Sequence, residues 1–335
     1  MAGRAPPGQA GAVPHRAVRV VGPVLLADSP TPELQTLSRA QYDLVEYALA
    51  GAGFALLAYT LYSWTSRGEV GVRYRPAVLA GLCIGAVATV SYLLLFLRWS
   101  SGYDLTDVGY VPDDQARLAL SPRYVDWSVT VPLLTAELLA VCALAGARVR
   151  ALRASAMTAA FLMILTGHLG AQIVDGGRDT TALVGWGLVS CVFYAYLYVA
   201  LIGAVRSSMP AMGREAAVSL RNATIVLLAG FGVYPLVYAI PVFVDVTASW
   251  LTTIQLAYSA ADVVAKVGFG VLVHKVAKLR TAEDVVEGVD THPEAVWVGN
   301  VEHSRAVLPP VRSGEERATP PVVGAGDPRR TGEHR

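Results

Sequence analysis

The sequence predicts an all-α membrane protein, a bundle of seven transmembrane helices. Hydrophobic residues make up 54% of its 335 residues and charged residues only 16%, with a mean hydropathy of +0.46. A soluble domain of this length would carry more charge. Runs of roughly 20 apolar residues, long enough to cross a hydrocarbon core, recur near 41–64, 76–98, 123–146, 153–174, 181–205, 219–243 and 250–276. The chain is therefore expected in the cell (plasma) membrane as a multi-pass protein surrounded by the lipid bilayer.

The two ends of the chain differ from the helical region, which is expected to cover 39–280. Residues 1–38 are rich in Pro, Ala and Gly, and their short apolar patch is too brief to span a membrane. They predict a flexible extracellular segment. Residues 281–335 are polar and contain several prolines, and they predict a disordered cytoplasmic tail.

The loop charges predict the orientation of the bundle. Arginine and lysine near the ends of spans are retained on the cytoplasmic side. Basic residues follow the first, third, fifth and seventh runs, whereas the alternate loops carry mainly aspartates. The N-terminus is therefore expected outside the cell and the C-terminus inside.

Motifs of soluble enzymes are missing from the sequence. Cys83, Cys142 and Cys191 fall inside apolar runs, so they are interpreted as packing residues that form no disulfide. No glycine-rich phosphate loop, zinc-ligand spacing or nucleophile motif appears. No metal site, nucleic-acid partner or enzyme activity is expected, and the chemistry must lie inside the bundle.

Lys266 stands in the middle of the seventh apolar run, whereas the chain's other two lysines, Lys275 and Lys278, lie at or beyond its end. An ammonium group at that depth is costly unless it is paired, deprotonated or covalently used. Asp262 lies four residues earlier, on the same helix face. The two residues form either a structural ion pair or the site of a chromophore bound to the lysine as a Schiff base.

The third run carries a stripe of polar side chains. At about 100° per residue, Arg123, Asp126, Thr130 and Glu137 return to roughly the same helix face, and Glu137 lies about 16 Å along the axis from Asp126. In the expected orientation, Arg123 is outermost and Glu137 lies toward the cytoplasm. Ionisable groups inside a membrane are functional candidates.

These segments carry a family resemblance. The sequence Arg-Tyr-Val-Asp-Trp-Ser-Val-Thr-Val-Pro-Leu-Leu at 123–134 resembles the third helix of microbial rhodopsins. Segments 230–238 and 262–270 resemble their sixth helix and their retinal-binding seventh helix. The resemblance covers about residues 40 to 280. It implies all-trans retinal bound to Lys266 as a protonated Schiff base, balanced by Asp126 and Asp262 with Arg123 nearby.

The same resemblance implies a function. Asp126, Thr130 and Glu137 match the acceptor, middle and donor positions of the outward proton pumps of the proteorhodopsin and xanthorhodopsin group. Desolvation by apolar neighbours should keep Glu137 protonated, so that it can donate from the inside. The sequence therefore predicts a light-driven outward proton pump.

The resemblance also assigns a retinal pocket and an antenna site. Aromatic rings suit a flat polyene, and the expected wall residues are Trp127, Phe231, Tyr234, Pro235 and Tyr238. Phe231 stands where the family usually has tryptophan, and Leu134 is associated with green absorption. Gly187 lies in a stretch similar to one in xanthorhodopsin that opens the wall for a carotenoid, although glycine is also common where membrane helices pack closely.

Several alternatives remain open. A retinal photosensor signalling to a partner is the main one, and a transporter without retinal is another; the Asp-Thr-Glu set does not match sodium pumps. Ser91 replaces the histidine that many related pumps place beside the acceptor. His168 is interpreted as a core or interface residue, with contact to Asp126 across an oligomer interface as the alternative. The resemblance suggests a homo-oligomer, a pentamer or a trimer.

Overall fold

The computed structural model describes residues 35–113, 116 and 121–308. All of them belong to the larger of two compact units, Thr31–Arg335. Most of the predicted N-terminal segment, and the predicted tail beyond residue 308, lie outside the described residues.

Seven membrane-length helical segments follow one another in the described part of the chain. The seventh consists of α7, a five-residue π-helical turn η6, and α8, which run on without interruption. The bounds are α1 (Arg39–Ser66), α2 (Arg75–Ser101), α3 (Ser121–Ala140), α4 (Ala147–His168), α5 (Thr180–Ser208), α6 (Arg214–Phe243), α7 (Ala248–Val263), η6 (Val264–Gly268) and α8 (Phe269–Val286).

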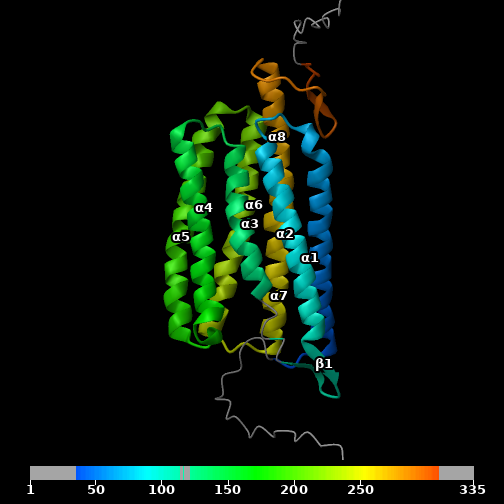
Figure 1. Cartoon of the computed structure of the whole chain (residues 1–335), viewed down its shortest axis with the longest axis vertical. Coiled ribbons are helices and arrows are strands. Elements are labelled where there is room, and N and C mark those ends of the chain that lie inside the picture. Colours follow the sequence, from blue (N-terminus) through cyan, green and yellow to red (C-terminus); the bar gives the residue numbers. More distant parts are fainter. Residues whose placement is uncertain (1–34, 114–115, 117–120, 309–335) are drawn as a thin grey trace, which may run out of the picture. The chain divides into compact units, whose positions relative to one another are not determined.

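The helices pack in the order of the sequence. Each helix from α1 to α6 contacts the next one, α6 contacts both α7 and α8, and α7 returns to contact α1. The helices therefore close into a ring of neighbours, as the side-by-side ribbons of Figure 1 illustrate. The predicted seven-helix bundle is confirmed.

Six of the seven segments are apolar enough to be recognised as membrane spans by length and composition: Arg39–Glu69, Arg75–Ser101, Val149–Gly177, Thr180–Ala211, Arg214–Phe243 and Ala248–Val286. The exception is α3, whose 20 residues include Arg123, Asp126 and Glu137. All three side chains are buried. The segment that does not meet the criteria for a membrane span, α3, is thus the one that places three charged residue types in the interior of the bundle.

The loop between α2 and α3 contains a β-hairpin. Strand β1 (Tyr103–Thr106) pairs antiparallel with β2 (Gly109–Pro112). Leu37, in the segment predicted to be flexible, is fully buried, and its backbone exchanges two hydrogen bonds with Tyr110. Order therefore begins before residue 39.

Residues 281–308 are ordered, contrary to the disorder predicted from residue 281. Helix α8 runs to Val286, and β3 (Val296–Val298) pairs antiparallel with β4 (Val301–Ser304). The segment before the hairpin is anchored by His292, which is buried and whose Nε2 lies 3.1 Å from the carbonyl oxygen of Gly68. Polar composition alone did not reveal this packing against the end of the bundle.

Asp284 fastens the end of α8 to the start of α2, and its loss should destabilise the protein. Tyr74 donates a hydrogen bond to its Oδ2 (2.9 Å), and Arg73 Nη1 lies 3.3 Å from the same atom. Burial raises the pKa of the Tyr74 phenol, which therefore stays a donor. We expect Asp284→Ala to cost about 1–3 kcal/mol and to lower the thermal midpoint measured by circular dichroism in detergent. Glu287→Ala, at an exposed position on the same end, is the control, and an equal shift in both variants would contradict the role of Asp284.

Candidate functional site

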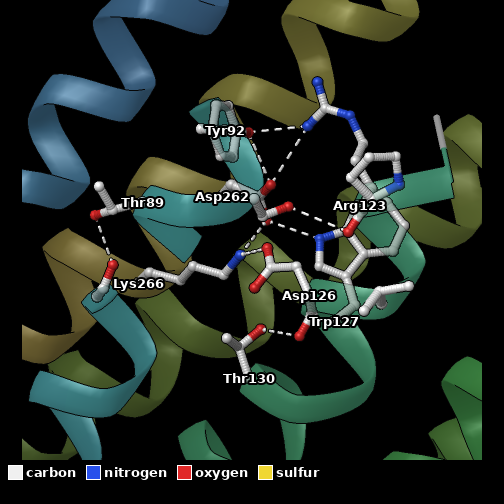
Figure 2. Close-up of polar contacts among 12 residues, drawn as sticks. Thr89, Tyr92, Arg123, Asp126, Trp127, Thr130, Asp262 and Lys266 are labelled. Carbon is white, nitrogen blue, oxygen red and sulfur yellow. Dashed lines mark hydrogen bonds and ion pairs between the residues drawn. The ribbon is translucent and has the colours of Figure 1, made fainter. Parts of the chain in front are cut away.

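Lys266 lies in the turn η6 and is almost completely buried. Its Nζ is 2.5 Å from Asp126 Oδ2 and 3.1 Å from Asp262 Oδ1. Figure 2 shows the end of the lysine side chain next to both carboxylates, one on α3 and one on α7 of its own helical segment. Helical turns of π type are frequent at functional sites. The proximity expected of these three residues is observed.

Asp262 accepts hydrogen bonds from side chains on three other helices, α2, α3 and α6. Tyr234 (2.6 Å) and Trp127 Nε1 (3.0 Å) donate to its Oδ1, and Tyr92 (2.8 Å) donates to its Oδ2. Hydrogen bonds of this kind favour the ionised carboxylate. Both oxygens of Asp262 are therefore engaged by donors beside the lysine.

Asp126 has a different environment, although it is equally buried. Its Oδ2 contacts Lys266, but its Oδ1 has no hydrogen-bond partner among the described residues. A buried oxygen without a partner is uncommon, and it is available to bind a proton. Of the two carboxylates, Asp126 is thus the one with fewer protein donors around its oxygens.

Arg123 closes the cluster on the side away from Lys266 (Figure 2). Its Nη1 donates to the Tyr92 hydroxyl (2.9 Å) and lies 3.4 Å from Asp262 Oδ2. Its Nη2 donates to Gln255 Oε1 (3.1 Å) and Ser259 Oγ (3.3 Å). The buried guanidinium group therefore offsets the second carboxylate charge, so that two cations face two anions.

Thr130 and Ser91 are buried beside the cluster, and both donate hydrogen bonds to the backbone of α3. Thr130 Oγ1 donates to the backbone oxygen of Asp126 (3.0 Å), and Ser91 Oγ donates to the backbone oxygen of Pro122 (3.1 Å). His168 lies against another aromatic residue, Tyr124, with ring centroids 4.6 Å apart.

Glu137 is buried on α3, eleven residues beyond Asp126. Its Oε1 accepts a hydrogen bond from the Tyr59 hydroxyl (3.4 Å), while its Oε2 has no partner among the described residues. Two glycines make room for this contact: a Cβ at Gly81 would lie 2.9 Å from Glu137 Oε1, and a Cβ at Gly270 would overlap the Tyr59 hydroxyl. An uncharged carboxylic acid is the form that suits such a site.

A cavity of about 320 Å³ lies beside the Lys266 cluster. Its lining is almost entirely apolar and aromatic, and its size falls in the range of small-molecule sites. Six predicted pocket residues line it: Trp127, Gly187, Phe231, Tyr234, Pro235 and Tyr238. Trp127 and Tyr234 also donate to Asp262 and so connect the cavity to Lys266. Leu134 is buried in the core but does not line the cavity.

These residues fit a retinal group on physical grounds. The cavity suits a flat apolar molecule, and a buried primary amine stands next to it. Gly187 has a packing reason as well, because a Cβ there would come within 2.8 Å of the Tyr238 ring.

Sequence reasoning missed several polar partners of the site. Tyr92 and Tyr59 lie on apolar helices, where a tyrosine resembles ordinary core packing. Gln255 and Ser259 did leave a signal, because together with Asp262 they follow the spacing of one helix face.

Comparisons with known proteins agree with the fold. Residues 44–279 match the family described as bacteriorhodopsin-like protein. Sensory rhodopsin-2 of Natronomonas pharaonis is 29% identical over 73% of this chain and 95% of its own length. The crystal structure of thermophilic rhodopsin matches with a TM-score of 0.68 at 30% identity, over 75% of this chain and 99% of that one. Xanthorhodopsin, whose structure is described as a light-driven ion pump with dual chromophore, matches with a TM-score of 0.66 at 29% identity and the same coverage.

Proposed function

Because this chain belongs to the bacteriorhodopsin-like family of seven-helix retinal proteins of the cell membrane, we propose that it is a light-driven outward proton pump. The family includes both ion pumps and sensory photoreceptors. The observation that favours a pump is Glu137, a buried carboxylic acid on the same helix as Asp126 and on the other side of Lys266.

The contacts of each residue suggest its role in the proposed pump. Lys266 would hold all-trans retinal through its Nζ, and the aromatic cavity would enclose the polyene. When bound, retinal supplies light absorption and isomerisation. Asp126 Oδ1 is free to bind the proton released from the Lys266 nitrogen, while Asp262, with its oxygens occupied, keeps its charge.

Glu137 then restores the proton on Lys266 from the opposite side. A protonated carboxyl in an apolar environment is a competent donor only when a neighbouring site has become a stronger base. We propose that the end of the bundle with the basic loops faces the cytoplasm, as the positive-inside rule requires. Release toward Arg123 and resupply through Glu137 then move protons outward.

The test uses intact cells that express the protein with retinal in unbuffered salt. Light should acidify the medium, and a protonophore should abolish the change. If the protein is coloured but light causes no pH change, the result would contradict the proposed proton pumping and favour the second candidate, a photosensor. The similarity to Sensory rhodopsin-2 is the observation in favour of that candidate.

Glu137→Gln should slow the resupply of the proton without affecting its release. We expect release of the first proton to survive, because the Asp126 cluster is untouched. Resupply should slow roughly 100-fold, so that steady-state acidification under continuous light falls at least about tenfold. Glu215→Gln, which breaks an exposed ion pair with Lys275, serves as the control and should pump normally. Steady-state pumping by Glu137→Gln equal to that of the unmodified protein would argue against the donor role.

We also propose a homo-oligomer, pentamer or trimer, and a carotenoid antenna near Gly187, on the strength of the family and of xanthorhodopsin respectively. Exposed Leu188 and Phe243 line the same cavity as Gly187, which would give a carotenoid access from the lipid. The Tyr238 ring occupies the space beside Gly187 and would have to yield. If a hydroxylated carotenoid is added and the excitation spectrum reports no energy transfer, the antenna is removed from the proposal.

A further inference from the structure

We propose that His274 and Glu69 form the proton-uptake relay that refills Glu137 through Tyr59. The proposal rests on the proposed pumping function and adds the route by which a proton reaches the donor. Glu137 is 2% exposed, so a proton from the cytoplasm must pass through other groups. Among the described residues, Tyr59 is the side chain that donates a hydrogen bond to it.

The inner half of the route lies between α1 and α8. The Tyr59 hydroxyl packs against Gly270 and reaches Glu137 from there. Ser63 follows one turn later on the same face of α1 and is buried. A tyrosine and a serine hydroxyl can each accept one proton while donating another. Both are thus suited to pass a proton toward Glu137.

The outer half begins one turn of α8 beyond Gly270, about 6 Å along the axis. His274 stands there with its side chain 5% exposed, and its ring meets the Tyr62 ring edge to face at 5.3 Å. Its Nε2 lies 3.3 Å from Glu69 Oε2. The Glu69 side chain is 45% exposed and is anchored by Lys278 Nζ at 2.8 Å. The pair therefore joins a half-exposed carboxylate to a buried imidazole one turn from Gly270.

A purely structural role does not require this histidine. Lys278 and Glu69 form their ion pair without it, and the Arg73–Asp284 pair already joins the end of α8 to the start of α2. An apolar ring would pack against Tyr62 equally well. Imidazole differs from such a ring in that it binds and releases protons near neutral pH.

The test is flash photolysis of the full-length, retinal-loaded protein in lipid nanodiscs at pH 7. A pH-indicator dye follows release and uptake of protons, and visible absorption follows recovery of the starting state. In His274→Phe we expect uptake to slow at least about tenfold with release unchanged, and in Glu69→Gln to slow by roughly threefold. Sodium azide, a small proton carrier, should restore the rate in His274→Phe.

Two matched variants control for the loss of a histidine and of an acid. His168→Phe changes a histidine on α4, and Glu215→Gln breaks an exposed pair with Lys275 at the same end of the bundle. Both should stay within about twofold of the unmodified protein. His274→Gln provides a second variant if His274→Phe fails to bind retinal.

The outcomes separate the relay from the pump. Uptake within twofold of normal in a coloured His274 variant would overturn the relay and leave the pump standing. Slow uptake that azide does not restore would assign His274 a structural role and also overturn the relay. An unmodified protein that neither releases nor takes up protons would overturn the proposed function, and the relay with it.

Discussion

Replacing Lys266 by alanine is expected to abolish the visible absorption band that forms on adding all-trans retinal. The chain has three lysines, and the other two are engaged elsewhere, Lys275 with Glu215 and Lys278 with Glu69. Lys266, in contrast, is buried and contacts Asp262, to which the cavity residues Trp127 and Tyr234 donate hydrogen bonds. The variant therefore has no amine with which retinal can form a Schiff base inside the bundle. Titration with retinal, followed by absorbance, measures the effect directly.

The same substitution should destabilise the protein. Asp126 and Asp262 would be left with Arg123 as the one remaining cation of the cluster, and breaking a buried ion pair typically costs about 3–5 kcal/mol. Lys275→Ala, at a side chain that is 40% exposed, is the control and should keep both the band and the stability.

Because the apolar cavity stays intact, a preformed imine of retinal with a short alkylamine should restore a band in Lys266→Ala. This result would separate loss of the amine from collapse of the pocket. A normal band from free retinal in Lys266→Ala would contradict the assignment of Lys266 as the attachment site.

The proximity of the central residues was predictable because it depends on helix geometry within single segments. Lys266 and Asp262 are four residues apart, and Arg123, Asp126 and Glu137 repeat at helical spacing, so each set shares a face. The high cost of burying isolated charges then requires the two faces to meet. The structure places Lys266 between Asp126 and Asp262, while the roles of these residues in proton transfer stay predictions.

The other contacts between helices were not predictable, because periodicity does not reveal how far each helix is rotated against its neighbour. Tyr92 and Tyr59 contact the two ends of the site from α2 and α1, yet both lie in uniformly apolar sequence. His274 also left no signal in the sequence, because its partner Glu69 lies on another element, far away along the chain. The hairpin after α8 was missed for a related reason, since its short strands gain stability from packing on the bundle.

Replacing Asp126 by asparagine is expected to abolish light-driven acidification while the protein still binds retinal. Asparagine keeps the size of the side chain but cannot take up a proton at neutral pH. Loss of a positioned acid–base group typically lowers a rate by about 100-fold to 10,000-fold, which would leave pumping at the background level. External pH under light, normalised to the amount of coloured protein, is the measurement. Asp104→Asn, on the exposed strand β1, is the matched control and should pump normally.

Asp262→Asn distinguishes the two carboxylates, because they differ in their partners and not in their depth. Asp262 accepts hydrogen bonds from Tyr92, Tyr234 and Trp127, so an amide there would place an NH₂ group against hydroxyl donors and remove a charge next to Arg123. Its main effect should be loss of stability and of retinal binding, whereas Asp126→Asn should still bind retinal and should stop transport. Continued pumping by a coloured Asp126→Asn protein would show that another group accepts the proton, and Asp262 would then be the first residue to test.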